Sequence, residues 1–229
     1  MKDGVILEDN PQMTNCAADY GRRCQSIGMK RRDPKSLDNA MAHPKFNERH
    51  HALLDELERE YLASLPLTER GPWMTVQGGA YKSKDEIVKA VEDGGHKFSD
   101  WARDLIMTDG WKLLSEGEEI DVYETTVKEL TGKDVVTTTE LYEIRDRLGF
   151  CDAPDETALL IRLAYTDQPM DEWRYVLSQP KADSDGDLAV LRVERDSSGS
   201  WVFWSYADPD GQWDGDARLL VCRKRPLAA

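Results

Sequence analysis

The chain has 229 residues, and 30 Lys and Arg residues against 44 Asp and Glu residues give a formal net charge of −14 at pH 7. This charge argues against a general nucleic-acid binder, because phosphates repel an acidic surface. A chain of this length can bury roughly 70% of the surface that its unfolded form exposes, so it needs no disulfide bond or metal ion to fold. No apolar run approaches the ~20 residues of a transmembrane helix, and the first residues lack the pattern of a secretory signal. We therefore expect a soluble, cytoplasmic protein with no membrane contact.

Charge is distributed unevenly along the sequence. Residues 21–51 carry eight basic and three acidic side chains, a local net charge of +5, whereas residues 52–229 carry 21 basic and 37 acidic ones, a net charge of −16. Residues 1–46 have few large apolar side chains and no sustained period, so we predict an irregular basic arm. This arm could contact nucleic acid weakly through its Arg and Lys pairs, or fold back onto the acidic body by intramolecular attraction. We favour the second.

Residues 47–70 are predicted to form an amphipathic helix and a linker. Leu53, Leu57 and Tyr61 recur at helical spacing, Asn47 can cap the helix, and Pro66 ends it. The Gly71-Pro72 step after it has the composition of a linker, so a separate domain is expected from residue 71 to residue 229.

The first part of this domain, residues 80–150, is predicted to be mainly helical. Ser83 has capping-box spacing to Glu86, and a second helix should start at Ser99. Alternating apolar and polar residues over 120–125 predict a half-buried strand. Thr137 and Glu140 again have capping-box spacing, which predicts a further helix ending at Gly149.

The second part, residues 157–225, contains five strand-like runs separated by turn sequences rich in Asp, Gly, Pro and Ser. Short runs joined by such turns predict an antiparallel meander with one face packed under the helices. Helices followed by strands predict the α+β class: helices packed on an antiparallel five-strand meander. The five runs are Ala158–Tyr165, Glu172–Ser178, Leu188–Arg195, Ser200–Tyr206 and Ala217–Lys224.

Several motifs of this region are similar to the end of a family of uncharacterised bacterial proteins. They are the LGFC segment at 148–151, Asp167-Gln168-Pro169, Glu172-Trp173, Asp183-Ser184-Asp185-Gly186 and the Trp-rich end, in this order. The resemblance extends over about residues 78–225 and leaves the basic arm outside. Because no activity or catalytic residue of the family is established, the resemblance implies domain limits and no function.

Aromatic residues gather near the C-terminus, and these form the candidate ligand-binding site. Alternation along the strand sends Trp201 and Phe203 to one face and Trp204 and Tyr206 to the other, and one of these faces should be core. If the second face is open, Trp204, Tyr206 and Trp213 form a stacking surface. Its polar edge would be Asp208, Asp210 and Asp214, which suit a neutral or cationic small ligand, or a protein. The plainer alternative, which the sequence alone favours, is that helices cover both faces and the aromatics only pack.

No metal site or cofactor is predicted. Asp183, Asp185 and Asp187 alternate like calcium ligands, but Gly186 occupies the fourth position of the loop where calcium loops need glycine at the sixth. An Asp-Gly hairpin turn is therefore expected. Cys16 and the other cysteines lack the close spacing of structural zinc sites.

The sequence does not decide whether the chain is an enzyme, and no catalytic residue can be named. Cys151 or Cys222 could pair with His96 by count alone, but no motif supports this, and buried inert thiols are expected. We therefore favour a non-catalytic binding or interaction module. The alternatives are a hydrolase-type enzyme that uses carboxylates near the same strand ends and a weak nucleic-acid contact through the arm.

Overall fold

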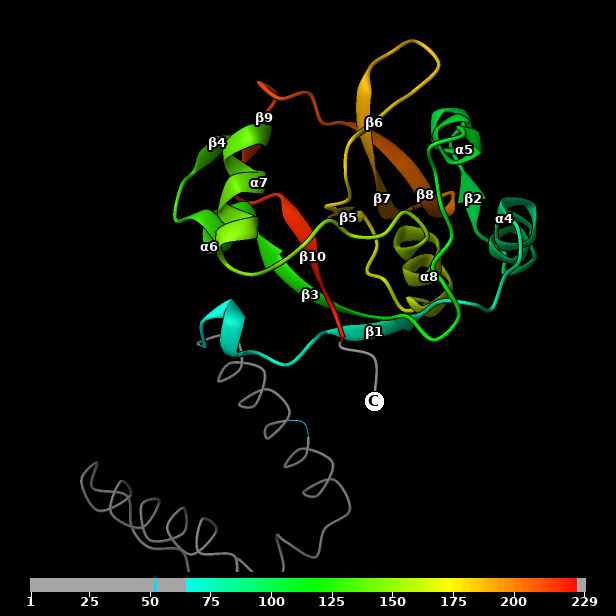
Figure 1. The fold of residues 1–229 in the computed structure, drawn as a ribbon, viewed down its shortest axis with the longest axis horizontal. Helices are drawn as coiled ribbons and strands as arrows, with labels where there is room; N and C mark the ends of the chain where they lie inside the picture. Colours follow the sequence, from blue (N-terminus) through cyan, green and yellow to red (C-terminus); the bar gives the residue numbers. More distant parts are fainter. Residues whose placement is uncertain (1–51, 53–64, 226–229) are drawn as a thin grey trace, which may run out of the picture. The chain divides into compact units, whose positions relative to one another are not determined.

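The computed structural model describes residue 52 and residues 65–225 (Figure 1). The predicted arm and the helix predicted from Asn47 therefore lie outside the described residues, apart from residue 52 itself. The chain divides into a unit of residues 1–64 and a compact unit from Leu65 to Ala229, and the second unit contains the sheet and the helices that pack on it. No helix of the described part is long and apolar enough to span a membrane.

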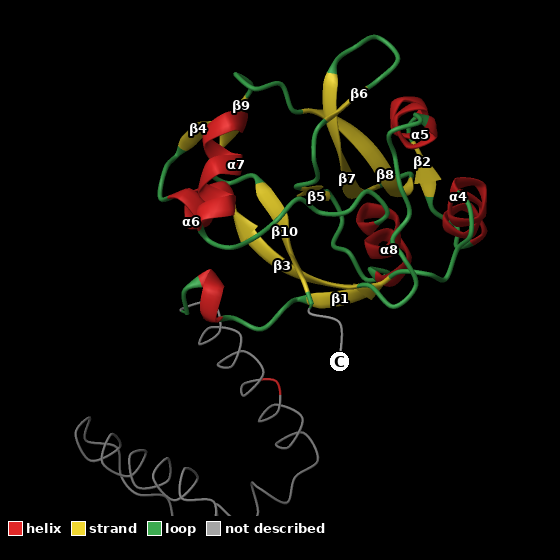
Figure 2. Cartoon of the chain, in the orientation of Figure 1, coloured by secondary structure: helices red, strands yellow, loops and turns green. Residues whose placement is uncertain are grey.

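The second unit has the α+β composition that the sequence predicts (Figure 2). Its helices are the 3-10 turn η1 (Leu67–Glu69), α4 (Lys84–Asp93), α5 (Asp100–Met107), α6 (Val127–Thr131), α7 (Thr138–Arg147) and α8 (Thr157–Ala164). Its strands are β1 (Met74–Gln77), β2 (Lys97–Phe98), β3 (Glu119–Thr126), β4 (Val135–Thr137), β5 (Glu172–Val176), β6 (Lys181–Ala182), β7 (Leu188–Asp196), β8 (Gly199–Tyr206), β9 (Gln212–Asp214) and β10 (Arg218–Lys224).

The predicted five-strand meander is wrong. The main sheet has eight strands in the order β1-β3-β10-β5-β7-β8-β2, with β6 paired to β7, and a separate small sheet joins β4 to β9. Most pairs are antiparallel, but β10 runs parallel to β5 and β2 runs parallel to β8. The hairpin β7–β8 is as predicted. The long pairing of β10 with β3 joins segments about a hundred residues apart, and no local turn sequence can predict such a pairing.

The first predicted strand, Ala158–Tyr165, is helix α8. Its sequence TALLIRLA is rich in Ala and Leu, which are good helix formers, and contains only one strongly β-branched apolar residue, Ile161. A short apolar run fits a buried helix as well as a buried strand, and alternation alone cannot separate the two. Leu159 and Ile161 are fully buried, and α8 packs against α4 and strands β1, β7 and β8.

The helix caps, by contrast, are at the residues that the sequence predicts, although at Ser83 the Glu86 carboxylate accepts from the Lys82 amide, so the predicted capping box does not form there. The Ser83 hydroxyl accepts a hydrogen bond from the Glu86 amide at 3.2 Å, and the Ser99 hydroxyl accepts one from Ala102 at 3.1 Å. Thr137 and Glu140 form a reciprocal capping box at the start of α7. These contacts lie within four residues, so local sequence predicts them.

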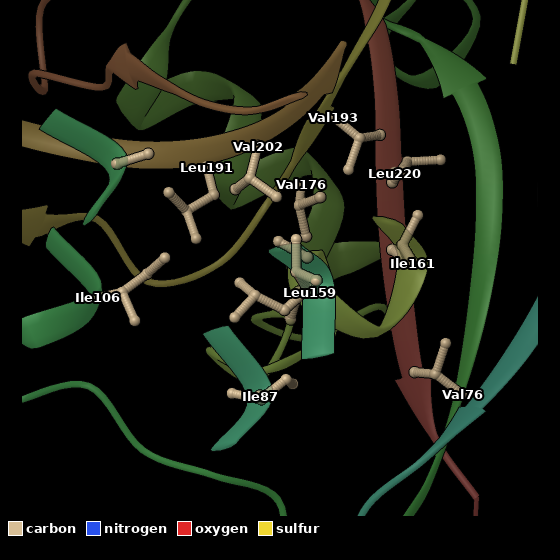
Figure 3. Packing of buried hydrophobic residues seen from close by; sticks show 14 of the residues in the cluster. Val76, Ile87, Ile106, Leu159, Ile161, Val176, Leu191, Val193, Val202 and Leu220 are labelled. Carbon is tan, nitrogen blue, oxygen red and sulfur yellow. The ribbon is translucent and has the colours of Figure 1, made fainter. Parts of the chain in front are cut away.

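Helices cover the two faces of the sheet unequally. Helices α4, α5 and α8 pack with one face, which contributes Leu191, Val193, Val202 and Leu220 to the larger buried cluster (Figure 3). Residues that alternate with these, such as Val221, point to the opposite face and join a second cluster with α6 and α7. That second cluster takes its sheet residues mainly from β3 and β10 and reaches β7 at Val190, whereas Trp173 of β5 and Phe203 of β8 lie outside it.

We expect Leu159→Ala to lower the free energy of unfolding by about 2–5 kcal/mol, because it opens a cavity beneath the sheet. The neighbouring Leu160→Ala is the matched control on the same helix: its side chain is only partly buried, so the loss should stay below about 2 kcal/mol. Urea denaturation of both variants measures the difference. Equal losses would contradict the difference in burial between the two side chains.

Candidate functional site

Trp204 and Tyr206 lie on the face of β8 that the helices cover. Trp204 is half-buried against the larger cluster, and its ring centroid lies 5.9 Å from that of Trp101 and 4.2 Å from that of Tyr206. Tyr206, at the end of the strand, keeps 59% of its surface exposed. Trp204 is therefore not part of a flat open platform, although Tyr206 is accessible.

Trp213 lies on β9 and is buried. Its indole N–H donates to the Thr138 hydroxyl at 2.9 Å, and its ring meets that of Tyr175 edge to face at 4.9 Å. This hydrogen bond secures β9 to the start of α7. Asp208 and Asp210 are exposed in the connection before β9, and Asp214 is exposed at its end.

The open part of the sheet carries the other aromatic pair of β8, Trp201 and Phe203. Cross-strand register sets Tyr175 and Phe203 opposite Arg192, and Trp173 and Trp201 opposite Glu194. The Arg192 guanidinium lies 4.8 Å from the Phe203 ring centroid and forms an ion pair with Glu194 at 2.7 Å. Alternation separated the two pairs correctly, but only the position of the helices decides which pair faces solvent.

Two adjoining hollows, one on this face and one at the end of β8 where residues of both faces meet, form what we call the aromatic groove. The larger, of about 600 Å³, lies between the start of β5 and the segment that joins β9 to β10. The smaller, of about 370 Å³, shares Tyr175, Gln212 and Trp213 with it. Of the predicted residues, Trp204, Tyr206 and Trp213 line the smaller hollow, Asp214 lines the larger, and Asp208 and Asp210 line neither. The larger hollow is lined by Pro169, Met170, Asp171, Glu172, Trp173, Tyr175, Gln212, Trp213, Asp214, Asp216, Ala217 and Arg218.

Carboxylates outnumber cations around the larger hollow. Glu172 is buried, and the charges of Arg174 and Arg218 compensate its own. It accepts hydrogen bonds from the Tyr165 hydroxyl at 2.8 Å and from Arg174 at 3.1 Å, and it forms an ion pair with Arg218. Burial and the bond to Glu172 raise the pKa of Tyr165 above its ordinary value. The excess negative charge of the groove therefore comes from its exposed acids, which are Asp171, Asp214 and Asp216.

Asp171 has a left-handed backbone, with φ of 59°. It is the one non-glycine residue with positive φ in the described part of the chain, and its amide donates to the Arg195 carbonyl at 2.8 Å. Asp tolerates this conformation better than most residues. The bend turns the chain from the Asp-Gln-Pro segment into β5 at the wall of the groove.

A buried polar network holds that wall in position. Arg162 and Gln168 are both fully buried, and the guanidinium donates to the Gln168 side-chain oxygen at 2.5 Å and to the Glu194 carbonyl at 3.3 Å. The Gln168 amide group donates in turn to the Glu172 and Val193 carbonyls. Burial lowers the pKa of Arg162 to about 10. From the sequence, Asp167-Gln168-Pro169 predicts only a turn. The glutamine between Asp and Pro is the single feature of the sequence that hints at this network.

The enzyme alternative predicts a pocket that contains an acid with a raised pKa. Burial does raise the pKa of Glu156, which is fully buried and accepts a hydrogen bond from the Leu114 amide at 2.6 Å. However, Glu156 precedes α8 and does not line the groove.

The two described thiols lie opposite each other at an isolated bridge, with Cys151 partly buried. Cys222 is fully buried opposite Cys151, and burial raises its pKa. Within residues 65–225, no contact joins His96 to either cysteine, and no group of three or more His, Cys, Asp or Glu side chains could hold a metal ion.

No family model matches the chain, and neither a curated protein nor a solved structure matches it. The resemblance to a family of uncharacterised bacterial proteins therefore stays a prediction.

We expect the Arg162–Gln168 contact to show strong coupling in a double-mutant cycle. Gln168→Met leaves a buried guanidinium without its side-chain acceptor and should cost about 3–5 kcal/mol of unfolding free energy. Arg162→Met should cost less, and the double variant should be more stable than the sum of the two losses predicts by at least about 1 kcal/mol. Urea denaturation measures all three, and additive losses would contradict the coupling.

Glu156→Gln should change how stability depends on pH. An acid whose pKa is higher in the folded than in the unfolded state destabilises the fold as pH rises through the folded value, and glutamine does not titrate. The variant should therefore be more stable than the parent at about pH 8 and nearly equal to it at about pH 4. Denaturation midpoints at both pH values test this. A difference that is independent of pH would argue against the raised pKa.

Proposed function

We propose that the chain is a non-catalytic binding module whose ligand lies in the aromatic groove. The observation that carries this proposal is the exposed Trp173, with 45% of its surface accessible, in a hollow of about 600 Å³ bordered by carboxylates. An exposed large aromatic side chain in a concave site is costly to keep in water and is typical of a ligand-contacting residue.

The chemistry of the groove favours a cationic group on the ligand. Aromatic faces attract ammonium and guanidinium groups, and the carboxylates of Asp171, Asp214 and Asp216 add charge complementarity. The same carboxylates repel phosphates. Met170, which is exposed at the rim, has a flexible side chain that can adapt to ligand shape. A neutral ring that stacks on Trp173 is the weaker alternative.

The hydrolase alternative has no comparable support, because Glu156, the described carboxyl whose pKa burial raises, lies outside the groove. A nucleic-acid contact through the basic arm would involve residues that the structure does not describe.

Titration of the full chain with arginine methyl ester, a quaternary ammonium compound, a neutral sugar and a nucleotide tests the proposal by calorimetry. The cationic compounds should bind most tightly. Trp173→Ala should weaken their binding about threefold to tenfold, the range expected from a lost cation–π contact. Asp171→Asn should weaken it as well, because asparagine keeps the left-handed backbone but removes the charge.

The matched control is Trp101→Ala, since Trp101 has the same exposed fraction, 45%, and does not line either hollow. This variant should bind the cationic compounds as the parent does. The proposal fails if no compound binds, or if the Trp101 and Trp173 variants lose affinity equally.

A further inference from the structure

The second half of β8 is a free sheet edge among the described residues. Strand β2 pairs with Trp201 and Val202 only, and the chain then turns into α5 (Figure 1). Phe203–Tyr206 therefore has β7 as its strand neighbour on one side and no strand on the other in the described part of the chain. A free edge presents backbone groups that another strand can pair with.

The orientation of the backbone identifies which groups are free. The Ala207 amide donates to the Leu188 carbonyl at 2.7 Å, toward β7, while the Val202 carbonyl accepts from the Ser99 amide on the other side. Because these directions alternate along a strand, the amide and carbonyl groups of Trp204 and Tyr206 point away from β7. Within residues 65–225, no backbone hydrogen bond occupies them on that side.

Aromatic side chains gather beside this edge. Trp101 of α5 is exposed, Tyr206 is more exposed still, and Trp204 lies between the rings of Trp101 and Tyr206. The buried indole N–H of Trp204 has no hydrogen-bond acceptor in the described part of the chain. An incoming strand could therefore gain side-chain contacts as well as backbone hydrogen bonds.

The charges around the edge are mainly negative. Asp104 of α5 accepts a hydrogen bond from the Ser184 amide, Asp187 precedes β7, and Asp208 follows the end of β8. The nearby cation Arg103 is already paired with Glu92. A second copy of this edge would bring like charges together, whereas a basic strand would be attracted.

We propose that the free edge of β8 binds an extended, lysine- or arginine-rich segment of a partner protein, which adds to the sheet as a further strand. Backbone hydrogen bonds to Trp204 and Tyr206 give affinity, and alternate apolar side chains of the segment pack on Trp101 and Tyr206. Trp204 and Tyr206 also line the smaller hollow, but neither residue lines the larger hollow that contains Trp173, so the proposal goes beyond the binding of a small cation there.

Hydrogen exchange of the full chain, read residue by residue by NMR, tests the proposal. The probe is a short synthetic peptide that alternates lysine with valine or phenylalanine. It should slow exchange of the Trp204 and Tyr206 amides about tenfold or more and leave the Phe203 and Ser205 amides, which face β7, unchanged. A peptide with glutamate in place of lysine, and one with alternate backbone amides methylated, should have no such effect.

Two variants separate the backbone contribution from the side chain. Tyr206→Ala and Tyr206→Pro both remove the ring, but only the proline removes the outward amide, and an edge strand tolerates proline at such a position. The proline variant should bind the peptide roughly fivefold more weakly than the alanine variant, the loss expected for one hydrogen bond. Trp173→Ala should bind it as the parent does, so failure of the groove proposal would not affect this result.

Three outcomes would overturn the proposal: no protection of the two amides by the lysine peptide, equal affinity of the alanine and proline variants, or slow exchange of both amides already in the free chain. The last outcome would mean that the edge is occupied without a partner.

Discussion

The arrangement of the groove depends on a buried guanidinium that no carboxylate contacts in the described part of the chain. Taking a guanidinium out of water is costly, and at Arg162 the cost is offset by carbonyl oxygens of Gln168, Tyr165 and Glu194. These acceptors belong to the end of α8, the Asp-Gln-Pro turn and β7. The network therefore joins a helix, a turn and a strand at one point, and the turn leads directly into the groove wall at Asp171.

Unequal helix cover explains where the accessible surfaces lie. Helices α4, α5 and α8 fill one face of the sheet, so Trp204 contributes to packing there, while Tyr206 at the end of β8 stays exposed. On the opposite face α6 and α7 cover β3 and β10, and the small β4–β9 sheet approaches Tyr175 through Trp213. On β5 and β8, beyond the region that α6 and α7 cover, Trp173 is exposed and Phe203 is half-buried. The groove lies at this boundary.

Local features were predictable from sequence, and non-local ones were not. The caps of Ser83 and Thr137 depend on residues three positions away, and β7 and β8 are joined by a short turn. Alternation over residues 158–165 predicts a strand, but the helix propensity of Ala and Leu prevails, and the segment is helix α8. The two faces of β8 were separated correctly, but which face is open depends on helices whose positions are set by distant packing. The same limit applies to Asp214, which reaches the groove, and to Asp208, which does not.

The two candidate surfaces use the same charge in physically different ways. In the aromatic groove a cation would meet ring faces and carboxylates, so discrimination depends on side chains and on the volume of the hollow. At the edge of β8 the main contacts would be backbone groups, which every sequence supplies, and the surrounding carboxylates would select basic segments from all extended ones. The net charge of −16 over residues 52–229 is therefore relevant to both proposed surfaces. At both proposed surfaces this charge would favour cationic partners, and it would oppose pairing of the free edge with a second copy of the same chain.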